Sequence, residues 1–389
     1  MKTEHGFVTC YYLCNIKNKI LKGTRNSVPF LYPFLDEEAA ESGRMRGYME
    51  SNTAYVTAVH RGRYELETEG NRFFGRMKAA KFLQPGKAEV FPTVGDKVEV
   101  NFEEHGDSII TKVLPRKSVF MRLNATQGQP DQAVAANFDY VFIVMSLNGD
   151  FHETKLERYL TVAWQSGGTP VLILSKADTC ENIDEYRSRA KKAAPGVEIL
   201  CLSAKTGMGM QALEPFIGRE KTIVLTGSSG VGKSSLINAL MGKNEMRTGE
   251  IREADAQGRH TTTYRQCFRL PEQIALPDGT QLTAGGKIID TPGMRTLHVS
   301  KAEKGVTITF NDVEVLSRQC RFSNCTHNGE PGCAIRTALD DGSLTEKRWQ
   351  TYLSMKREEQ YAKQREIVLS RKMSRTKQKY KRNSRMDWE

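Results

Sequence analysis

The sequence contains no long apolar run: none approaches the roughly 18 consecutive residues that a helix needs to cross a bilayer. Its opening stretch mixes apolar side chains with charged and amide ones, and it lacks a small-residue cleavage site typical of a signal peptide. These absences argue against an integral membrane protein and against a secreted one. We therefore expect a cytoplasmic protein.

Acidic residues are the minority among the charged ones. Lys and Arg number 57 against 46 Asp and Glu, which gives a formal net charge of +11. The excess is uneven, because residues 343–389 hold fourteen basic and six acidic side chains and so carry +8. A basic surface permits a polyanionic partner such as nucleic acid without proving one. The 389 residues suffice for about two to four domains.

Cysteine is scarce, and three of the eight cysteines lie beside a histidine near the C-terminal end. The spacing is Cys320-x₄-Cys325-x-His327-x₅-Cys333. Cytosolic proteins seldom keep structural disulfides, whereas Zn²⁺ prefers four-coordinate Cys₃His sites. Three thiolates and an imidazole leave no position for a water molecule, so the spacing predicts one structural Zn²⁺. Four unrelated residues or free buried thiols are the alternative.

The N-terminal third has the pattern of short strands. Residues 1–45 show no clear period and stay an unassigned extension, whereas 46–115 contain alternating runs such as TAYVTAVH and DKVEVNF between turn signals. Several short strands at this spacing predict a small β-barrel of the OB type. A β-meander without a nucleic-acid role fits the pattern equally well.

Residues 116–299 alternate buried strands with helices. DYVFIVMSL is a continuous apolar run, typical of a strand buried on both faces, and the strands VLILSKAD and VEILCLSAK follow helical stretches at 153–165 and 183–192. This alternation predicts a parallel sheet with helices on both faces. Ligands of such sheets bind at the carboxyl ends of the strands, where the motifs described next all lie.

The clearest motif follows the strand TIVLT and matches G-x-x-x-x-G-K-[ST]. Its glycines let backbone N–H groups converge on phosphate oxygens at a helix N-terminus. Lys233 would reach the β- and γ-phosphates, and the Ser234 hydroxyl would ligate Mg²⁺. The predicted phosphate-binding residues are Gly227, Ser228, Ser229, Gly230, Val231, Gly232, Lys233, Ser234 and Ser235.

Two later motifs have the character of nucleotide-sensing switches. Asp290-Thr-Pro-Gly293 ends the strand KIID, where the acid can hold Mg²⁺ through water and the Gly293 amide can sense the γ-phosphate. Between it and the phosphate loop lies the polar segment 258–263, GRHTTT, in which Thr261 or Thr262 can offer a hydroxyl to Mg²⁺. A solvated loop without function is the alternative for this segment.

Base recognition is predicted at the ends of two consecutive strands. The Asp178 carboxylate can accept hydrogen bonds from the N1–H and the 2-amino group of guanine, which adenine lacks, while the Lys176 stem covers the base. The next strand ends in a segment resembling the loop that supports the guanine O6. The predicted residues are Ser175, Lys176 and Asp178, then Ser203, Ala204 and Lys205. Guanine is therefore favoured over adenine.

The order of these motifs is inverted relative to an ordinary GTPase, in which the phosphate loop comes first and base recognition last. Together with the Cys/His spacing, the order resembles the circularly permuted, ribosome small-subunit-dependent GTPases of bacteria over residues 48–365. The resemblance implies an OB-like barrel, a permuted P-loop GTPase domain and, at 300–370, a helical zinc-binding domain. It also implies GTP/GDP with Mg²⁺, stimulation by the 30S subunit late in its maturation, contact with 16S rRNA, and release on hydrolysis.

The C-terminal end is predicted to be only partly folded. A capping box at Ser343–Glu346 predicts the start of a helix. Residues 371–389 are too basic and too poor in apolar side chains to fold alone, which predicts a disordered tail. We expect a monomer without a membrane partner.

Two departures from the family pattern affect the site. Ser175 stands where the usual base-recognition motif has Asn, a change expected to loosen the base-binding loop while Asp178 still selects guanine. Met294 follows Gly293, where many GTPases carry the glutamine that orients the attacking water, so the resemblance implies low intrinsic turnover. His260 is our candidate for that task.

The predicted catalytic residues are thus His260, Lys233 and Thr262. Two other functions remain compatible with the sequence. One is an rRNA-binding module with nucleotide-gated binding and little turnover; the other is a GTPase that acts on a membrane or a protein partner.

Overall fold

The computed structural model describes residues 52–68, 71–77, 91–103, 105–122, 131–242, 265–290 and 302–386. The predicted extension at 1–45, the switch segment 258–263 and Gly293 lie outside these described residues. Within the described ranges, no helix combines the length and the apolar character that a membrane span requires.

Five short strands close into a barrel: β1 (Thr53–Val59), β2 (Tyr64–Thr68), β3 (Asn71–Met77), β4 (Lys97–Asn101) and β5 (Ser108–Val113). The strand order is β1-β2-β3-β5-β4, and a pairing of β4 with β1 closes it. Alternate residues point inward, so that Leu66, Val98 and Ile110 share one core. This order is compatible with the predicted OB type, which stays a prediction.

A parallel sheet of five strands forms the centre of the second domain, in the order β10-β9-β8-β11-β15. The strands are β8 (Tyr140–Ser146), β9 (Thr169–Ser175), β10 (Glu198–Cys201), β11 (Thr222–Gly227) and β15 (Lys287–Asp290), and β12 (Gln266–Arg269) adds an antiparallel strand beside β15. Six of the seven β8 residues are buried, as expected for a strand covered on both faces.

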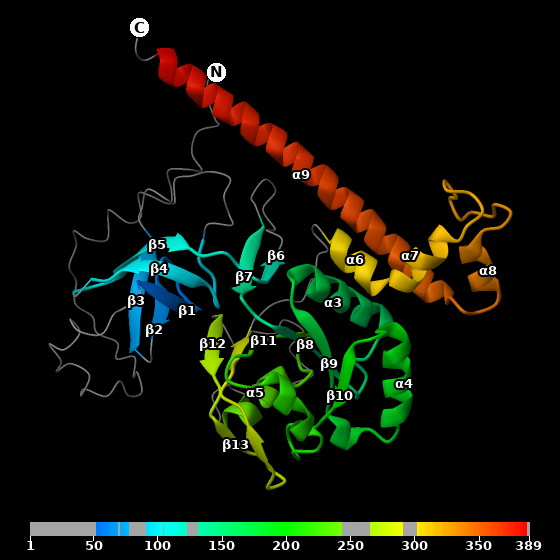
Figure 1. The fold of residues 1–389 in the computed structure, drawn as a ribbon, viewed down its shortest axis with the longest axis horizontal. Helices are drawn as coiled ribbons and strands as arrows, with labels where there is room; N and C mark the ends of the chain where they lie inside the picture. Colours follow the sequence, from blue (N-terminus) through cyan, green and yellow to red (C-terminus); the bar gives the residue numbers. More distant parts are fainter. Residues whose placement is uncertain are drawn as a thin grey trace, which may run out of the picture. The chain divides into compact units, whose positions relative to one another are not determined.

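Helices cover both faces of this sheet (Figure 1). One face packs against α3 (Glu153–Ser166) and α4 (Ile183–Ala193), and the other against α5 (Lys233–Met241) and the short η5 (Met210–Phe216). The predicted α/β fold class is therefore confirmed. Short elements complete it: β6 (Val119–Arg122), β7 (Gln132–Ala136), η4 (Ala177–Thr179), β13 (Gln273–Ala275) and β14 (Gln281–Thr283).

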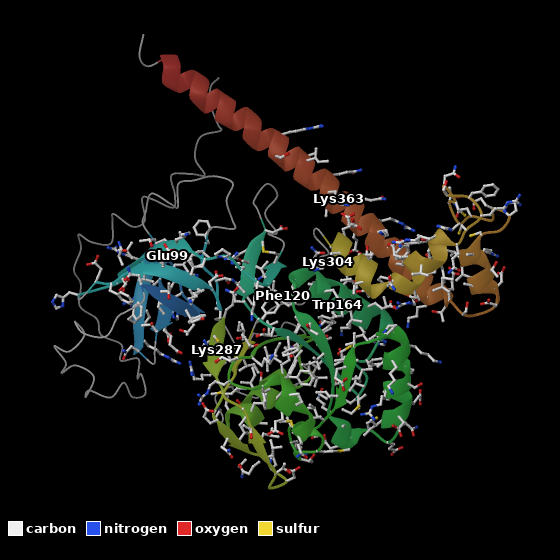
Figure 2. The ribbon with its side chains drawn as sticks, in the orientation of Figure 1. Glu99, Phe120, Trp164, Lys287, Lys304 and Lys363 are labelled. Carbon is white, nitrogen blue, oxygen red and sulfur yellow. The ribbon has the colours of Figure 1, made fainter. Side chains whose placement is uncertain are left out.

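The barrel and the parallel sheet are continuous through one strand pair. β1 runs antiparallel to β12, with Ala58 opposite Gln266. Nearby, the Lys287 ammonium (labelled in Figure 2) lies 4.1 Å from the centre of the Tyr55 ring, a cation–π contact between β15 and β1. Gly95 fits closely against the sheet domain, because a Cβ at this position would lie 2.1 Å from the Ala136 carbonyl oxygen.

Four helices form the C-terminal domain: α6 (Glu303–Thr309), α7 (Asn311–Arg318), α8 (Ala334–Asp340) and α9 (Glu346–Met386). Val306, Phe310, Ile335 and Trp349 lie in their shared core. Helix α6 also crosses α3 closely, since a Cβ on Gly305 would lie 2.0 Å from a backbone oxygen of α3.

Helix α9 differs from its prediction at both ends. It begins at Glu346, and the Thr345 hydroxyl accepts a hydrogen bond from Arg348 N at 3.3 Å, so the cap is Thr345 and not Ser343. At the other end, α9 continues to Met386 in place of the disordered tail predicted at 371–389. The sequence has no Gly or Pro after Gly342 and is rich in Lys, Arg and Gln, which favour the helix.

A buried arginine holds the C-terminal domain against the sheet domain. Arg348 on α9 is 8% exposed, and all five of its N–H groups have acceptors. Two bonds of 2.8 and 2.7 Å go to Asp312, one of 2.8 Å to Glu157 Oε1 on α3, and two of 2.9 and 3.4 Å to the carbonyl oxygens of Thr309 and Ala193. One side chain thus ties α9 to α3, to the end of α4 and to the α6–α7 junction.

Replacing Arg348 with methionine is expected to lower the free energy of unfolding by about 3 kcal/mol, because it leaves the buried Glu157 carboxylate without its partner. Urea denaturation measures the change. Arg336→Met is the matched control: its ion pair with Asp340 is exposed, so a loss under about 0.5 kcal/mol is expected. Adding Glu157→Met to Arg348→Met should restore stability in part. Equal losses for the two single variants would contradict this role of Arg348.

Candidate active site and metal centre

The predicted phosphate loop connects β11 to α5 and adopts a conformation that only glycine accommodates easily. Gly227, Gly230 and Gly232 have φ angles of 141°, 79° and 96°. Gly227 is also closely packed, because a Cβ there would lie 2.2 Å from the Val144 carbonyl oxygen. The loop leads directly into α5, and the N-terminus of a helix favours an anion such as phosphate.

The side chains around this loop lie where a nucleotide–Mg²⁺ complex requires them. Lys233 Nζ donates to the carbonyl oxygen of Gly227 at 2.8 Å and to that of Ser228, so the ammonium group lies over the loop. Asp290 is 5% exposed and ends β15 opposite Leu225, which places its carboxylate at the same edge of the sheet as the loop. Ser234 is half-buried in the first turn of α5.

The two predicted base-recognition loops are joined by backbone hydrogen bonds. Ala177 N donates to the Leu202 carbonyl oxygen at 3.2 Å, which brings the end of β9 to the end of β10. Ser203 is buried, and its hydroxyl accepts hydrogen bonds from Lys205 N and Thr206 N, at 3.3 Å each. Lys176 has a left-handed φ of 58°, and the next residue but one, Asp178, is exposed. Its carboxylate is therefore accessible to a base.

Ser175 connects these loops to the phosphate loop. It is 5% exposed, and its hydroxyl donates to the Val231 carbonyl oxygen at 2.6 Å. The Met145 carbonyl oxygen, at the end of β8, lies 3.3 Å from the same hydroxyl. The serine that replaces the usual asparagine thus provides a bond between base-recognition and phosphate loops, which opposes the loosening expected from the sequence.

One residue near the phosphate loop was not predicted. Tyr159 on α3 is 4% exposed, and Ser228 of the phosphate loop is near enough to lower the pKa of its hydroxyl. Burial raises the pKa of Tyr159, and the negative charge of Asp150 acts in the same direction. The helical spacing of Leu156, Tyr159, Leu160 and Ala163 would have indicated a buried face. Nothing in the sequence indicates that this tyrosine lies near the phosphate loop.

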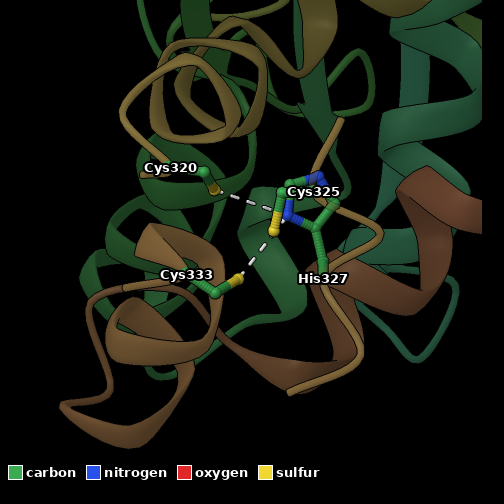
Figure 3. Close-up of side chains that lie close together, drawn as sticks. All are labelled: Cys320, Cys325, His327 and Cys333. Atoms are coloured by element: carbon green, nitrogen blue, oxygen red, sulfur yellow. Dashed lines mark hydrogen bonds between the residues drawn. The ribbon is translucent and has the colours of Figure 1, made fainter. Parts of the chain in front are cut away.

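The four predicted metal ligands come together in the C-terminal domain (Figure 3). The ligand atoms of Cys320, Cys325, His327 and Cys333 all lie within 4.8 Å of one another. His327 Nδ1 is 3.6 Å from the Sγ atoms of both Cys320 and Cys333. Trp349 of α9 packs edge-on against the His327 ring, with 5.6 Å between centroids. This cluster could bind a metal ion.

The loop between the ligands is held by a carboxylate. Glu330 accepts hydrogen bonds from Thr326 Oγ1 and N, at 2.5 and 2.8 Å, and from Asn328 N at 2.9 Å. These bonds, that of the Thr326 side chain foremost, lower the pKa of Glu330 to about 2. Cys333 caps the N-terminus of α8, and its Sγ accepts a hydrogen bond from Arg336 N at 3.4 Å. The chelating loop is therefore ordered by the protein itself.

The structure brings together the phosphate loop, both base-recognition loops and Asp290 at one edge of the sheet, and it separately gathers the four Cys/His side chains in the C-terminal domain. Four predicted site residues lie outside the described residues and remain predictions: His260, Thr261, Thr262 and Gly293.

The chain is similar in sequence to a set of bacterial proteins. The family model described as RsgA GTPase matches residues 113–300. The small ribosomal subunit biogenesis GTPase RsgA 2 of Listeria monocytogenes serotype 4b (strain F2365) is 44% identical over 311 residues, which are 80% of this chain and 84% of that protein. The protein of the same name from Lactiplantibacillus plantarum is 38% identical over 306 residues, 79% of this chain and 83% of its own length.

Two solved structures share the fold. YjeQ from Thermotoga maritima superposes with a TM-score of 0.55 at 27% identity, covering 78% of this chain and 96% of its own. YloQ, described as a circularly permuted GTPase, has a TM-score of 0.53 at 23% identity and covers 83% and 98%. The latter likeness concerns the fold alone, and it agrees with the inverted motif order read from the sequence.

Replacing Ser175 with alanine removes its bond to the Val231 carbonyl oxygen without changing the backbone. Affinity for GDP is expected to fall about five- to tenfold, the effect of one buried hydrogen bond. Titration with a fluorescent GDP analogue measures it. Ser166→Ala is the matched control, because Ser166 is equally buried but lies at the far end of α3, where its hydroxyl bonds to Ala163 O. Unchanged GDP affinity in Ser175→Ala would show that the bond does not support the site.

Proposed function

The chain belongs to the RsgA GTPase family, and from this premise we propose that it hydrolyses GTP during late maturation of the small ribosomal subunit. The observation that carries the proposal is its 44% identity, over four fifths of the chain, to a GTPase named for that process. In this proposal the 30S subunit stimulates hydrolysis, and the protein leaves the subunit afterwards.

Each part of the proposed site has a distinct task. Asp178 selects guanine, and the amides of the phosphate loop together with Lys233 hold the phosphates. Ser234, Asp290 and Thr262 are the candidates for Mg²⁺, which when bound neutralises charge that develops on the phosphate oxygens. Ser175 keeps the base-recognition loop and the phosphate loop at a fixed separation through its bond to Val231.

Activation of the attacking water is assigned to His260. The residue after Gly293 is Met294, which has no group that orients water. His260 lies in sequence beside Thr261 and Thr262, so it would be near the Mg²⁺ ion that these threonines are proposed to bind. Its imidazole is able to accept a proton or to donate a hydrogen bond near neutral pH.

The Cys/His cluster is proposed to hold one structural Zn²⁺. In a tetrahedral site with Zn–S of about 2.3 Å and Zn–N of about 2.0 Å, sulfur and nitrogen are about 3.5 Å apart. His327 Nδ1 lies 3.6 Å from two of the sulfur atoms, which fits this geometry. Three cysteines and one histidine complete the coordination and leave no open position for catalysis.

The barrel and the C-terminal domain are proposed to contact 16S rRNA. The net charge of +11, of which residues 343–389 carry +8, suits a polyanionic partner. The protein would act as a monomer in the cytoplasm. The remaining alternative is an rRNA-binding module whose nucleotide gates binding with little turnover, and steady-state phosphate release distinguishes it from a GTPase.

Addition of 30S subunits is expected to raise phosphate release from GTP at least about tenfold, while 50S subunits and liposomes do not. Cosedimentation with the same three partners should detect binding to 30S alone, stronger with a non-hydrolysable GTP analogue than with GDP, and weaker as salt rises. Lys233→Ala should abolish turnover, and Lys191→Ala, an exposed change on α4, should not.

Binding to 50S or to liposomes instead would refute the proposed partner. Binding to 30S without stimulated phosphate release would favour the rRNA-binding module. In the same assay His260→Ala should lose the stimulated rate and keep GTP binding, and an unaltered rate would remove His260 from the mechanism.

The purified chain is expected to contain one zinc ion, measured by inductively coupled plasma mass spectrometry. Cys325→Ser should lose most of the metal and lower the melting temperature of the C-terminal domain, since binding of a structural metal stabilises the fold. Cys180→Ser is the matched control, because Cys180 is half-buried and lies outside the cluster. Full zinc content in Cys325→Ser would contradict the assignment.

A further inference from the structure

The segment between β12 and β15 folds into a hairpin of its own. Strands β13 and β14 pair antiparallel, with Ile274 opposite Leu282, and form a separate two-stranded sheet. The turn between them is well defined, because the Asp278 carboxylate accepts a hydrogen bond from Thr280 N at 3.0 Å and Gly279 has a left-handed φ of 84°. The hairpin adds no strand to the sheet that carries the nucleotide motifs, so completing that sheet is not its role.

One face of the hairpin is buried against η5. Ile274, Leu276 and Leu282 are buried, and they share a hydrophobic core with Met210 and Leu213 of η5. The residues on either side of Leu282 are exposed, as expected for a hairpin with one covered face. An isolated two-stranded hairpin is at best marginally stable in water, so this hairpin depends on its contact with η5.

Hydrogen bonds fix the hairpin to η5 and to the turn after it. Thr283 N donates to Glu214 Oε1 at 3.0 Å, and Gly286 N donates to the Ile217 carbonyl oxygen at 3.0 Å. The approach at Gly286 is close, because a Cβ there would lie 2.6 Å from the Gly218 carbonyl oxygen. These contacts hold the hairpin beside η5, which follows the second base-recognition loop in the chain.

The tip of the hairpin lies against that base-recognition loop. Gly207 is buried, although the residues on either side of it are exposed. A Cβ on Gly207 would lie 2.8 Å from Asp278 Cγ and 3.0 Å from Asp278 N, so the tip covers this glycine. Gly207 N donates to the Ser203 carbonyl oxygen at 3.0 Å and thereby closes the turn that contains Ala204 and Lys205. The hairpin thus contacts the loop predicted to support the guanine O6.

The charge of the hairpin does not suit a contact with RNA. Residues 271–286 contain Glu272 and Asp278 and no Lys or Arg, in a chain with a net charge of +11. Glu272 pairs with Arg219 at 2.9 Å, and Asp278 lies at the tip. The phosphate groups of rRNA would repel a tip that carries a negative charge and no positive one. The contacts of the hairpin therefore favour a role toward the nucleotide over a role toward the ribosome.

We propose that the β13–β14 hairpin is a specificity element for guanine: its tip, with Asp278 as the positioning residue, holds the turn from Ser203 to Gly207 in the conformation that receives the O6 atom of the base. An exposed loop of small residues without such a contact adopts many conformations, and binding has to restrict them. Contact with the tip restricts them beforehand, which increases affinity for a base that carries O6. The proposal rests on the proposed binding of GTP and is independent of the ribosomal partner.

The test measures how three nucleotides compete with a fluorescent GDP analogue for the full-length chain. They are GDP, inosine diphosphate, which keeps O6 and lacks the 2-amino group, and 2-aminopurine riboside diphosphate, which lacks O6. Asp278→Ala removes the side chain beside Gly207 and should weaken GDP and inosine diphosphate about fivefold each, the effect of one less ordered hydrogen bond. Affinity for 2-aminopurine riboside diphosphate should change less than about twofold. Equal losses for all three nucleotides, or no loss, would overturn the proposal.

Two matched variants accompany Asp278→Ala. Asp278→Asn keeps an acceptor for Thr280 N and the bulk beside Gly207, so it should retain the native affinities. A loss as large as that of Asp278→Ala would show that charge and not position acts, and would refute the assignment. Gln281→Ala changes an exposed residue of the same hairpin, on the face opposite Leu282, and should also retain the native affinities. A GDP-selective loss there would contradict the role of the tip.

The native chain and Asp178→Ala keep failure of this proposal distinct from failure of the proposed function. The native chain should bind GDP far more tightly than ADP, and Asp178→Ala should lose the preference for GDP over inosine diphosphate, because Asp178 is proposed to contact the 2-amino group. Equal binding of GDP and ADP by the native chain would refute the guanine site itself. A native preference for GDP that Asp278→Ala leaves unaltered would refute only the role of the hairpin.

Discussion

The architecture depends on the burial of one guanidinium group. Arg348 enters the space between α3, α4 and the α6–α7 junction and satisfies all five N–H groups there. Removing such a charge from water is costly, and only complete hydrogen bonding offsets it. The cost is evident at its partner: burial raises the pKa of Glu157 to about 7, although attraction to Arg348 opposes the shift. These five hydrogen bonds therefore hold the C-terminal domain against α3 and the end of α4.

This docking connects the sheet domain, which carries the candidate nucleotide site, to the domain that carries the Cys/His cluster. Trp349, the residue after Arg348, packs against His327 of the Cys/His cluster, so the same turn of α9 contacts both α3 and that cluster. Bonds of Glu330 keep the chelating loop closed, and the Ser175–Val231 bond keeps the two nucleotide loops together. In each of the two sites, hydrogen bonds between a side chain and nearby backbone groups thus hold the loop in place.

What the sequence predicted, and what it missed, follows from how far apart the cooperating residues lie. The phosphate loop and the metal ligands are contiguous segments, so their spacing alone carries the chemistry. The central strands β8, β9 and β11 are mostly apolar runs, and they were equally visible in the sequence. By contrast, Arg348 and Glu157 are 191 residues apart, and Ser175 and Val231 are 56 apart, and no local pattern links such residues. The sequence beyond residue 370 is highly charged, which predicted disorder. The segment is helical because it contains no Gly or Pro and is rich in residues that favour a helix.

The strand order also fixes a sequence of events during synthesis. Strands β8, β9 and β10 are neighbours both in the chain and in the sheet, so the half that carries the predicted base-recognition loops is synthesised before the phosphate loop. The half that holds phosphate is then added on the opposite side of β8, first β11 and later β15. β12 ends this side by meeting β1, which left the ribosome more than two hundred residues earlier. The segments that form the barrel and strands β8 to β10 are therefore synthesised first. The phosphate loop and β15, which complete the site, follow later.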